Sequence, residues 1–196
     1  PLNKKIKEKQ YKIIDATIKK IIPMGNQIHG KQIVDDAIMD EIYNRCNIKI
    51  EHLKENFPEY PFRDFHYTKN YFQTLISKMK SKTSSSIFLR AIGTLGGGNH
   101  YIEFNEDYDR KAYLTIHSGS RALGQAVCNY HQGKITQENK NSLNNYLQNE
   151  ELVEYLIDMI FAQTVASMNR ELMIKLIINE IGVEWNKDNL IETIHN

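Results

Sequence analysis

The stretches GTLGGGNHYIEF at 93–104 and AYLTIHSGSRALG at 112–124 decide which fold we expect of this chain. Within them, residues 101–104 and 112–117 are rich in β-branched and aromatic side chains, which favour strands. The polar residues 105–110 between these two runs have the composition of a turn. Together they predict a β-hairpin with a glycine-dense loop before its first strand.

Helices are predicted on both sides of this hairpin, because apolar residues recur there at helical spacing. The expected helices cover residues 4–22, 32–45, 70–80 and 150–181. An ordered loop is expected at 57–67 and a Ser-rich linker loop at 81–86. We therefore expect an α+β fold, in which a mixed sheet containing the hairpin packs against several helices in a single unit over residues 1–196.

The composition is that of an ordinary globular protein, with 41% hydrophobic and 25% charged residues. No stretch reaches the roughly 18 apolar residues of a membrane span, and no secretory signal is recognisable, so we expect a cytoplasmic or nuclear protein without a membrane partner. The net charge of +1 means that any contact with nucleic acid must be local. Cys46 and Cys128 are far apart and lie in no CxxC pair, which argues against a disulfide framework or a cysteine zinc site.

Two histidines make the hairpin a candidate metal site. If the turn is centred on Tyr108 and Asp109, His100 lies opposite His117, with Cβ atoms roughly 5 Å apart on one face. Two imidazoles at that distance can bind one metal ion or a close pair of ions, whereas a shift of the pairing by one residue would separate them. The alternative is that one histidine is a satisfied core residue and the other is solvated.

The second strand runs into a candidate anion site, Ser118-Gly119-Ser120-Arg121. Hydroxyls, glycine amides and a guanidinium come together here, and Arg121 can donate two hydrogen bonds to one phosphate. An ordinary turn with an N-cap serine and a solvated arginine would have the same composition. Neither the phosphate-binding loop of nucleoside triphosphatases nor the nucleophile elbow of serine hydrolases fits this spacing.

The same residues carry a resemblance to a known family. The stretches GTLGGGNHYIE at 93–103 and HSGSRALG at 117–124 closely resemble the two central signatures of the RtcB family, ligases that seal RNA ends in tRNA splicing and repair. The resemblance extends to YLIDMIFAQ at 155–163, to Asn169-Arg170 and to the final IHN, and more weakly to IPMG at 22–25. It implies an RtcB-like core around a metal-bearing hairpin.

The resemblance also implies roles for particular residues. Three histidines would be Mn²⁺ ligands, in a complete site of two ions: His100, His117 and His195. Four residues would bind the nucleotide, GTP, with Asn99 at its phosphates and Glu103 at the guanine edge: Asn99, His100, Tyr101 and Glu103. Three residues would contact a phosphate of RNA: Ser118, Ser120 and Arg121.

The reaction implied by the resemblance joins an RNA 3′-phosphate or 2′,3′-cyclic phosphate to a 5′-hydroxyl through a guanylylated histidine. The expected partners are RNAs with such ends, tRNA halves among them, and an archease-type activator. The family's upstream Asp-x-Gly-Cys-Gly motif and the motif of the guanylylated histidine have no counterpart here, so we assign no catalytic residue. The chain is expected to be the central segment of such a ligase and inactive alone.

Two other functions remain open at this stage. A degenerate relative would keep a metal- and phosphate-binding module without the covalent chemistry. A metal-dependent phosphohydrolase would use the histidines to hold an activated water, but Asp and Glu are scarce near His100 and His117, which argues against it.

Overall fold

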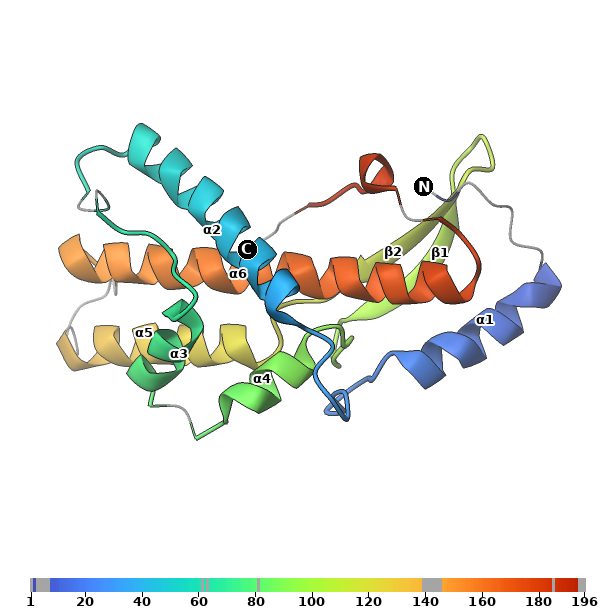
Figure 1. The fold of residues 1–196 in the computed structure, drawn as a ribbon, viewed down its shortest axis with the longest axis horizontal. Coiled ribbons are helices and arrows are strands. Elements are labelled where there is room, and N and C mark those ends of the chain that lie inside the picture. The colour runs from blue at the N-terminus through green and yellow to red at the C-terminus, as the bar shows by residue number, and fades with distance from the viewer. Residues whose placement is uncertain are drawn as a thin grey trace.

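The computed structural model describes residues 2, 8–60, 62, 64–80, 82–138, 146–184 and 186–193. Helices and one hairpin make up this part of the chain (Figure 1). The elements are α1 (Glu8–Ile21), α2 (Asp36–Asn56), α3 (Tyr71–Lys78), α4 (Ser85–Ala91), β1 (Tyr101–Glu106), β2 (Ala112–His117), α5 (Ala122–Glu138), α6 (Asn149–Glu180) and the 3-10 helix η1 (Lys187–Asn189). The α+β class expected from the sequence is confirmed.

Helix α6 lies at the centre of the fold and contacts α1, α2, α5 and β2. It is 32 residues long, and buried positions occur on all its sides. A helix that buries side chains on all its sides must be enclosed by other elements. Figure 1 shows α5 running beside α6, α2 crossing it on the other side, and the hairpin and α1 lying along its C-terminal half.

Two groups of buried side chains hold these elements together. The larger one surrounds Phe161 of α6, whose ring centroid lies 5.1 Å from that of Tyr71 and 6.0 Å from that of Tyr43. The smaller one joins α1 to the C-terminal half of α6 through residues such as Ile18 and Ile177. The apolar face of the hairpin packs on this smaller core, with Ile102, Phe104, Leu114 and Ile116.

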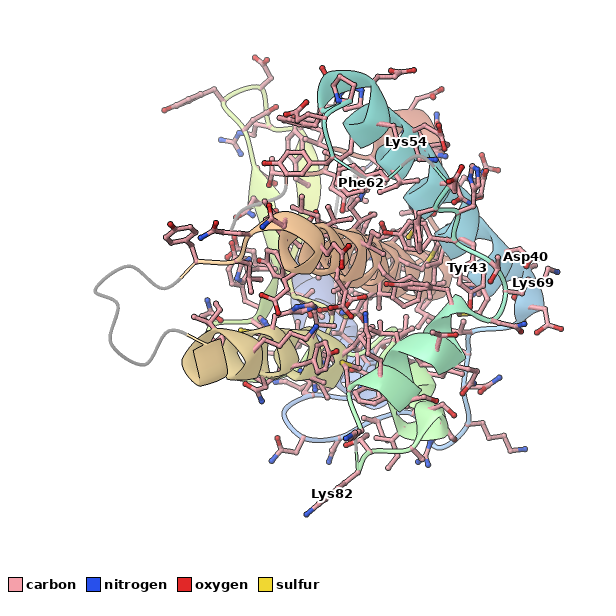
Figure 2. The ribbon with its side chains drawn as sticks, turned by 90° about the vertical axis from the view of Figure 1, so that its left-hand side faces the viewer. Asp40, Tyr43, Lys54, Phe62, Lys69 and Lys82 are labelled. Carbon is pink, nitrogen blue, oxygen red and sulfur yellow. The ribbon has the colours of Figure 1, made fainter. Side chains whose placement is uncertain are left out.

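In the ordered loop expected at 57–67, described residues contact α2: the backbone amide of Tyr67 donates to the side-chain oxygen of Asn47 at 2.8 Å. Phe62 is 1% exposed, and Tyr43 of α2 donates a hydrogen bond of 3.0 Å from its hydroxyl to the carbonyl of Lys69. The ammonium of Lys69 also lies 2.9 Å from a carboxylate oxygen of Asp40. Figure 2 shows Phe62 turned inward, the Asp40–Lys69 pair at the edge, and Lys82 pointing away from the molecule.

Three predicted boundaries are wrong. Helix α2 begins at Asp36 and not at residue 32, because the carboxylate of Asp35 caps it by accepting from the amide of Ile38 at 2.9 Å, and it continues to Asn56. The expected linker at 81–86 is shorter in the described part of the chain, since Ser85 and Ser86 form the first turn of α4. The N-cap position of α4 is Ser84, and the backbone amide of Ile87 donates to its carbonyl at 3.0 Å.

The hairpin forms where it was predicted, but its register differs by one residue. Tyr101, not His100, pairs with His117, because the turn at 107–111 has five residues and closes through the Asp107 amide and the Lys111 carbonyl at 3.1 Å. The expected mixed sheet is also wrong for the described residues, where the sheet has two antiparallel strands. Among the described residues the parallel contact is a single bridge, Met24 to Gly96.

None of the described helices combines the length and the apolar character that a bilayer-spanning segment requires.

Candidate metal and phosphate site

Three loops far apart in the sequence meet at one end of the hairpin. The amide of Leu95 donates to the carbonyl of Pro23 at 3.0 Å, and the amide of Gly25 donates to the carbonyl of Gly96 at 2.7 Å. Arg121 crosses both loops, donating from Nη2 to the Gly25 carbonyl at 2.6 Å and from Nε to the Thr94 hydroxyl at 3.0 Å. The glycine-dense loop is therefore held from two sides.

The two hairpin histidines lie side by side, although they are not paired across the strands as expected. The ring centroids of His100 and His117 are 5.7 Å apart. His117 ends β2 and stacks on its cross-strand partner Tyr101, with centroids 5.4 Å apart and planes 22° from parallel. His100 belongs to the loop just before β1, and the loop conformation, not strand pairing, brings its ring to His117.

His100 has the properties of a neutral metal ligand. Its Nδ1 atom is buried and has no hydrogen-bond partner among the residues that the structure describes. Burial, and then the charges of Arg121 and His117, lower the pKa of His100, so its imidazole is neutral near pH 7. A neutral imidazole with an unpartnered nitrogen is a suitable Mn²⁺ ligand, and the neighbouring imidazole of His117 could be a second ligand.

The third expected ligand, His195, lies outside the described residues. Within residues 8–193, apart from the gaps given above, no three His, Cys, Asp or Glu side chains are grouped closely enough to hold a metal ion. The described residues therefore offer two neighbouring candidate donors, His100 and His117.

The polar face of the hairpin holds the expected nucleotide-binding residues. Tyr101 and Glu103 project from the same face of β1, because they are two residues apart, and both are exposed. The carboxylate of Glu103 accepts a hydrogen bond of 3.0 Å from the side-chain amide of Asn105, which also donates to the hydroxyl of Thr115 at 2.9 Å. Asn99 is exposed in the loop beside His100. These groups lie on the side of the sheet that carries His117.

The expected phosphate-binding residues are partly engaged within the protein. Ser118 is 6% exposed, and its hydroxyl donates to the carbonyl of Leu95 at 2.7 Å. Arg121 has a left-handed backbone, with φ of 59°, and burial lowers the pKa of its guanidinium. Ser120 packs closely against Gly124, where an added Cβ would lie 2.3 Å from the Ser120 hydroxyl oxygen. Arg121 therefore braces the loops in this structure and brings positive charge to them.

Two residues of α6 take part in the site but were not assigned a role from the sequence. Asn169 is fully buried and contacts both motif loops through its amide. Arg170 donates to the carbonyl of Ser118 at 2.9 Å and also pairs with Glu192. An Asn-Arg pair within the apolar part of a long helix was the available signal, because burying such groups is costly unless they have partners.

A cavity of about 1180 Å³ adjoins the histidines and runs between the hairpin and helices α5 and α6. Its wall includes His100, His117, Ser118, Ser120 and Arg170, and the segment around Glu192. Ser167 of α6 holds that segment by donating to Glu192 at 2.7 Å. The space is large enough for a nucleotide or the end of an RNA strand.

The features described so far are those of an α+β protein with paired histidines beside a glycine-dense, cationic loop. Comparison with known families gives a specific match, because the family model described as tRNA-splicing ligase RtcB matches residues 2–196. The chain therefore belongs to the RtcB family.

Two curated relatives share part of the sequence. The chain is 30% identical over 99 residues to the RNA-splicing ligase RtcB of Escherichia coli strain K12, and equally to the RNA-splicing ligase RtcB1 of Escherichia coli strain ATCC 25922. The matched stretch covers 46% of this chain and 24% of each relative. No solved structure matches the chain.

Proposed function

We propose that this chain is the metal- and nucleotide-holding part of an RNA ligase that joins a 3′-phosphate or 2′,3′-cyclic phosphate end to a 5′-hydroxyl end, using GTP and Mn²⁺. The observation that carries the proposal is the pair of neighbouring imidazoles, His100 and His117, beside the loop braced by Arg121. Both relatives named RNA-splicing ligase support it.

His100 and His117 would hold the metal, with His195 as a further ligand. Bound Mn²⁺ would neutralise phosphate charge and act as a Lewis acid. The residues around it orient the two rings: Tyr101 stacks on His117, and the absence of a Cβ at Gly96 leaves room for His100 beside Arg121. Rings held in this way lose little freedom when a ligand binds, which favours affinity.

The nucleotide and the RNA end would lie on the polar face of the hairpin and in the adjoining cavity. Asn99 would contact the phosphates of GTP, and the exposed carboxylate of Glu103 would accept hydrogen bonds from the guanine edge. For an RNA phosphate, Arg121 would supply positive charge and Ser120 a hydroxyl donor, and Ser118 would take part by exchanging its hydrogen bond to Leu95 for one to the phosphate. The RNA partners would be broken strands such as tRNA halves, and an archease-type protein would be an activator.

A metal-binding module without ligase chemistry is the second candidate. The observation in its favour is that the described residues contain two neighbouring ligands but no third. Such a module would bind Mn²⁺ and phosphate groups yet form no covalent bond to a nucleotide.

The first test measures Mn²⁺ binding by isothermal titration calorimetry with the wild-type chain, His100→Ala, His117→Ala and a control, His66→Ala. His66 is 63% exposed on the surface and lies outside the site. We expect each site variant to bind Mn²⁺ at least about tenfold more weakly, and the control to bind normally. Equal binding in all four proteins would refute the proposed site.

A second assay separates the two candidate functions. The protein, as the longest chain that its gene encodes, is incubated with Mn²⁺, GTP labelled at the α-phosphate, and RNA halves that end in a 3′-phosphate and a 5′-hydroxyl. Joined RNA, lost in His100→Ala, would support the ligase. Mn²⁺ binding without joining or protein labelling would favour the module.

A further inference from the structure

The side chain of Asn169 joins the two loops that carry the paired histidines. It lies in α6 and is completely buried. On one side of it is the start of the glycine-dense loop, which leads to His100, and on the other side is the loop that follows His117.

The amide of Asn169 uses its whole hydrogen-bonding capacity. Its Oδ1 atom accepts from the backbone amides of Gly93 and Thr94, at 2.6 and 3.0 Å. Its Nδ2 atom donates to the carbonyls of Thr94 and Gly119, at 3.2 and 2.9 Å, and to the Ser118 hydroxyl at 3.1 Å. One side chain therefore accepts from two backbone amides and shares its two N–H groups among three acceptors, in two loops that lie more than twenty residues apart in the sequence.

Only an amide matches this arrangement. Reversing the side-chain amide of Asn169 would place its NH₂ group against the backbone amides of Gly93 and Thr94, and its oxygen against the carbonyls of Thr94 and Gly119. Neither contact could be a hydrogen bond, so a single orientation is allowed. Aspartate would keep the acceptor but turn a second oxygen toward the carbonyls of Thr94 and Gly119. Leucine has a similar volume but would leave all five groups without this partner, and buried polar groups without partners are costly.

The contacts lie close to the histidines along the chain. Ser118 directly follows His117, and its hydroxyl donates to Leu95 while it accepts from Asn169. Thr94 contacts Asn169 through its backbone N–H and carbonyl. Its hydroxyl also accepts a hydrogen bond from the guanidinium of Arg121. A shift of either loop at Asn169 would therefore change the separation of the two imidazoles.

We infer that Asn169 is a positioning residue that sets the separation of His100 and His117 before a ligand binds. The metal-binding consequence rests on the proposed function, whereas the effect on the two rings does not. A merely structural role would lower stability without changing the surroundings of the histidines in the protein that remains folded.

The test compares Asn169→Asp and Asn169→Leu with Thr164→Val, a matched control on the same helix. Thr164 is also completely buried, but its hydroxyl bonds to the Ile160 carbonyl and to Lys49, away from the loops. All proteins are studied at a temperature where thermal unfolding shows them to be folded. Nitrogen and proton NMR of the imidazoles, without metal, reports the surroundings of His100 and His117, and calorimetry reports Mn²⁺ affinity.

We expect both Asn169 variants to shift the imidazole signals of His100 and His117 and to weaken Mn²⁺ binding by about tenfold or more. Thr164→Val should leave both readouts as in the wild type. Unchanged imidazole signals in folded Asn169→Asp and Asn169→Leu would overturn the inference. If the wild type binds no Mn²⁺, the proposed function fails, and the imidazole signals still decide the role of Asn169.

Discussion

Gly96 is the residue at which the packing of the site is tightest. Its φ is +91°, and an added Cβ would lie 1.8 Å from Arg121 Nη1 and 2.5 Å from His100 Nδ1. We expect Gly96→Ala to lower the free energy of unfolding by about 2 to 4 kcal/mol, because it combines a strained backbone with a displaced arginine and histidine. Urea-induced unfolding measures this loss.

Gly98→Ala is the control for Gly96→Ala. Gly98 also has a positive φ, of +72°, but no atom lies within 4 Å of an added Cβ. Its expected loss of stability is about 1 kcal/mol, from the backbone alone. Equal losses in the two variants would show that backbone conformation, and not the contact with Arg121 and His100, requires glycine at residue 96.

At the scale of elements, Asp158 of α6 connects α3 and α5. Its buried carboxylate accepts from Lys78 of α3 at 2.6 Å and contacts His131 of α5 at 2.8 Å. Burial alone would raise the pKa of Asp158, but hydrogen bonds from His131, Lys78 and Tyr71 outweigh it, and the net direction is downward. The ionised carboxylate therefore stabilises the contact of these three helices.

Asp158→Asn is expected to lower the free energy of unfolding by about 3 kcal/mol at pH 7, because Lys78 would lose a buried charged partner. The folded pKa is below the unfolded value of about 3.9, so this stabilisation is complete above that pH and is lost as pH falls through the folded pKa. The difference between wild type and variant, measured by urea unfolding, should shrink below about pH 4.

The exposed pair Asp15–Lys19 supplies the comparison for this prediction. The side chain of Asp15 is 61% exposed, so Asp15→Asn should cost less than about 1 kcal/mol. The free energies of unfolding of wild type and Asp158→Asn could instead differ by a constant amount from pH 6 to the acid limit of folding. In that case the ionised carboxylate of Asp158 would not be the source of the stabilisation.

For the whole molecule, the two cores predict two levels of stability. Phe161 lies at the centre of the larger core, whereas Ile18 belongs to the smaller core under the hairpin. We expect Phe161→Ala to cost about 3 to 5 kcal/mol and Ile18→Ala about 2 to 4 kcal/mol. Native-state hydrogen exchange should show Ile18→Ala reducing protection mainly in α1 and the hairpin, and Phe161→Ala reducing it everywhere.

This difference is expected because α6 belongs to both cores, while α1 and the hairpin contact only its C-terminal half. Local opening of the smaller core can then leave the aromatic core intact. Should Ile18→Ala reduce protection equally in α2 and α5, the molecule would open as one cooperative unit, and the two-level description would be wrong.

Local sequence determined the family and most of the elements, although no helix range was predicted for α4 or α5. The strands at 101–104 and 112–117 and the helix at 150–181 were predicted closely, because strand preference, turn composition and helical periodicity act over neighbouring residues. The two signatures at 93–103 and 117–124 also sufficed to indicate the RtcB family, which the family comparison confirms. The roles assigned to individual site residues remain predictions.

Tertiary structure decided how those elements meet. The register of the hairpin depends on the hydrogen bonds of a five-residue turn, and one residue more or less exchanges the partner of His117. The contacts of Arg121 with Gly25 and of Asn169 with Gly93 and Gly119 join residues up to 96 positions apart. Such pairings arise because buried polar groups must find partners in space, and local preferences carry no information about which distant group that partner is.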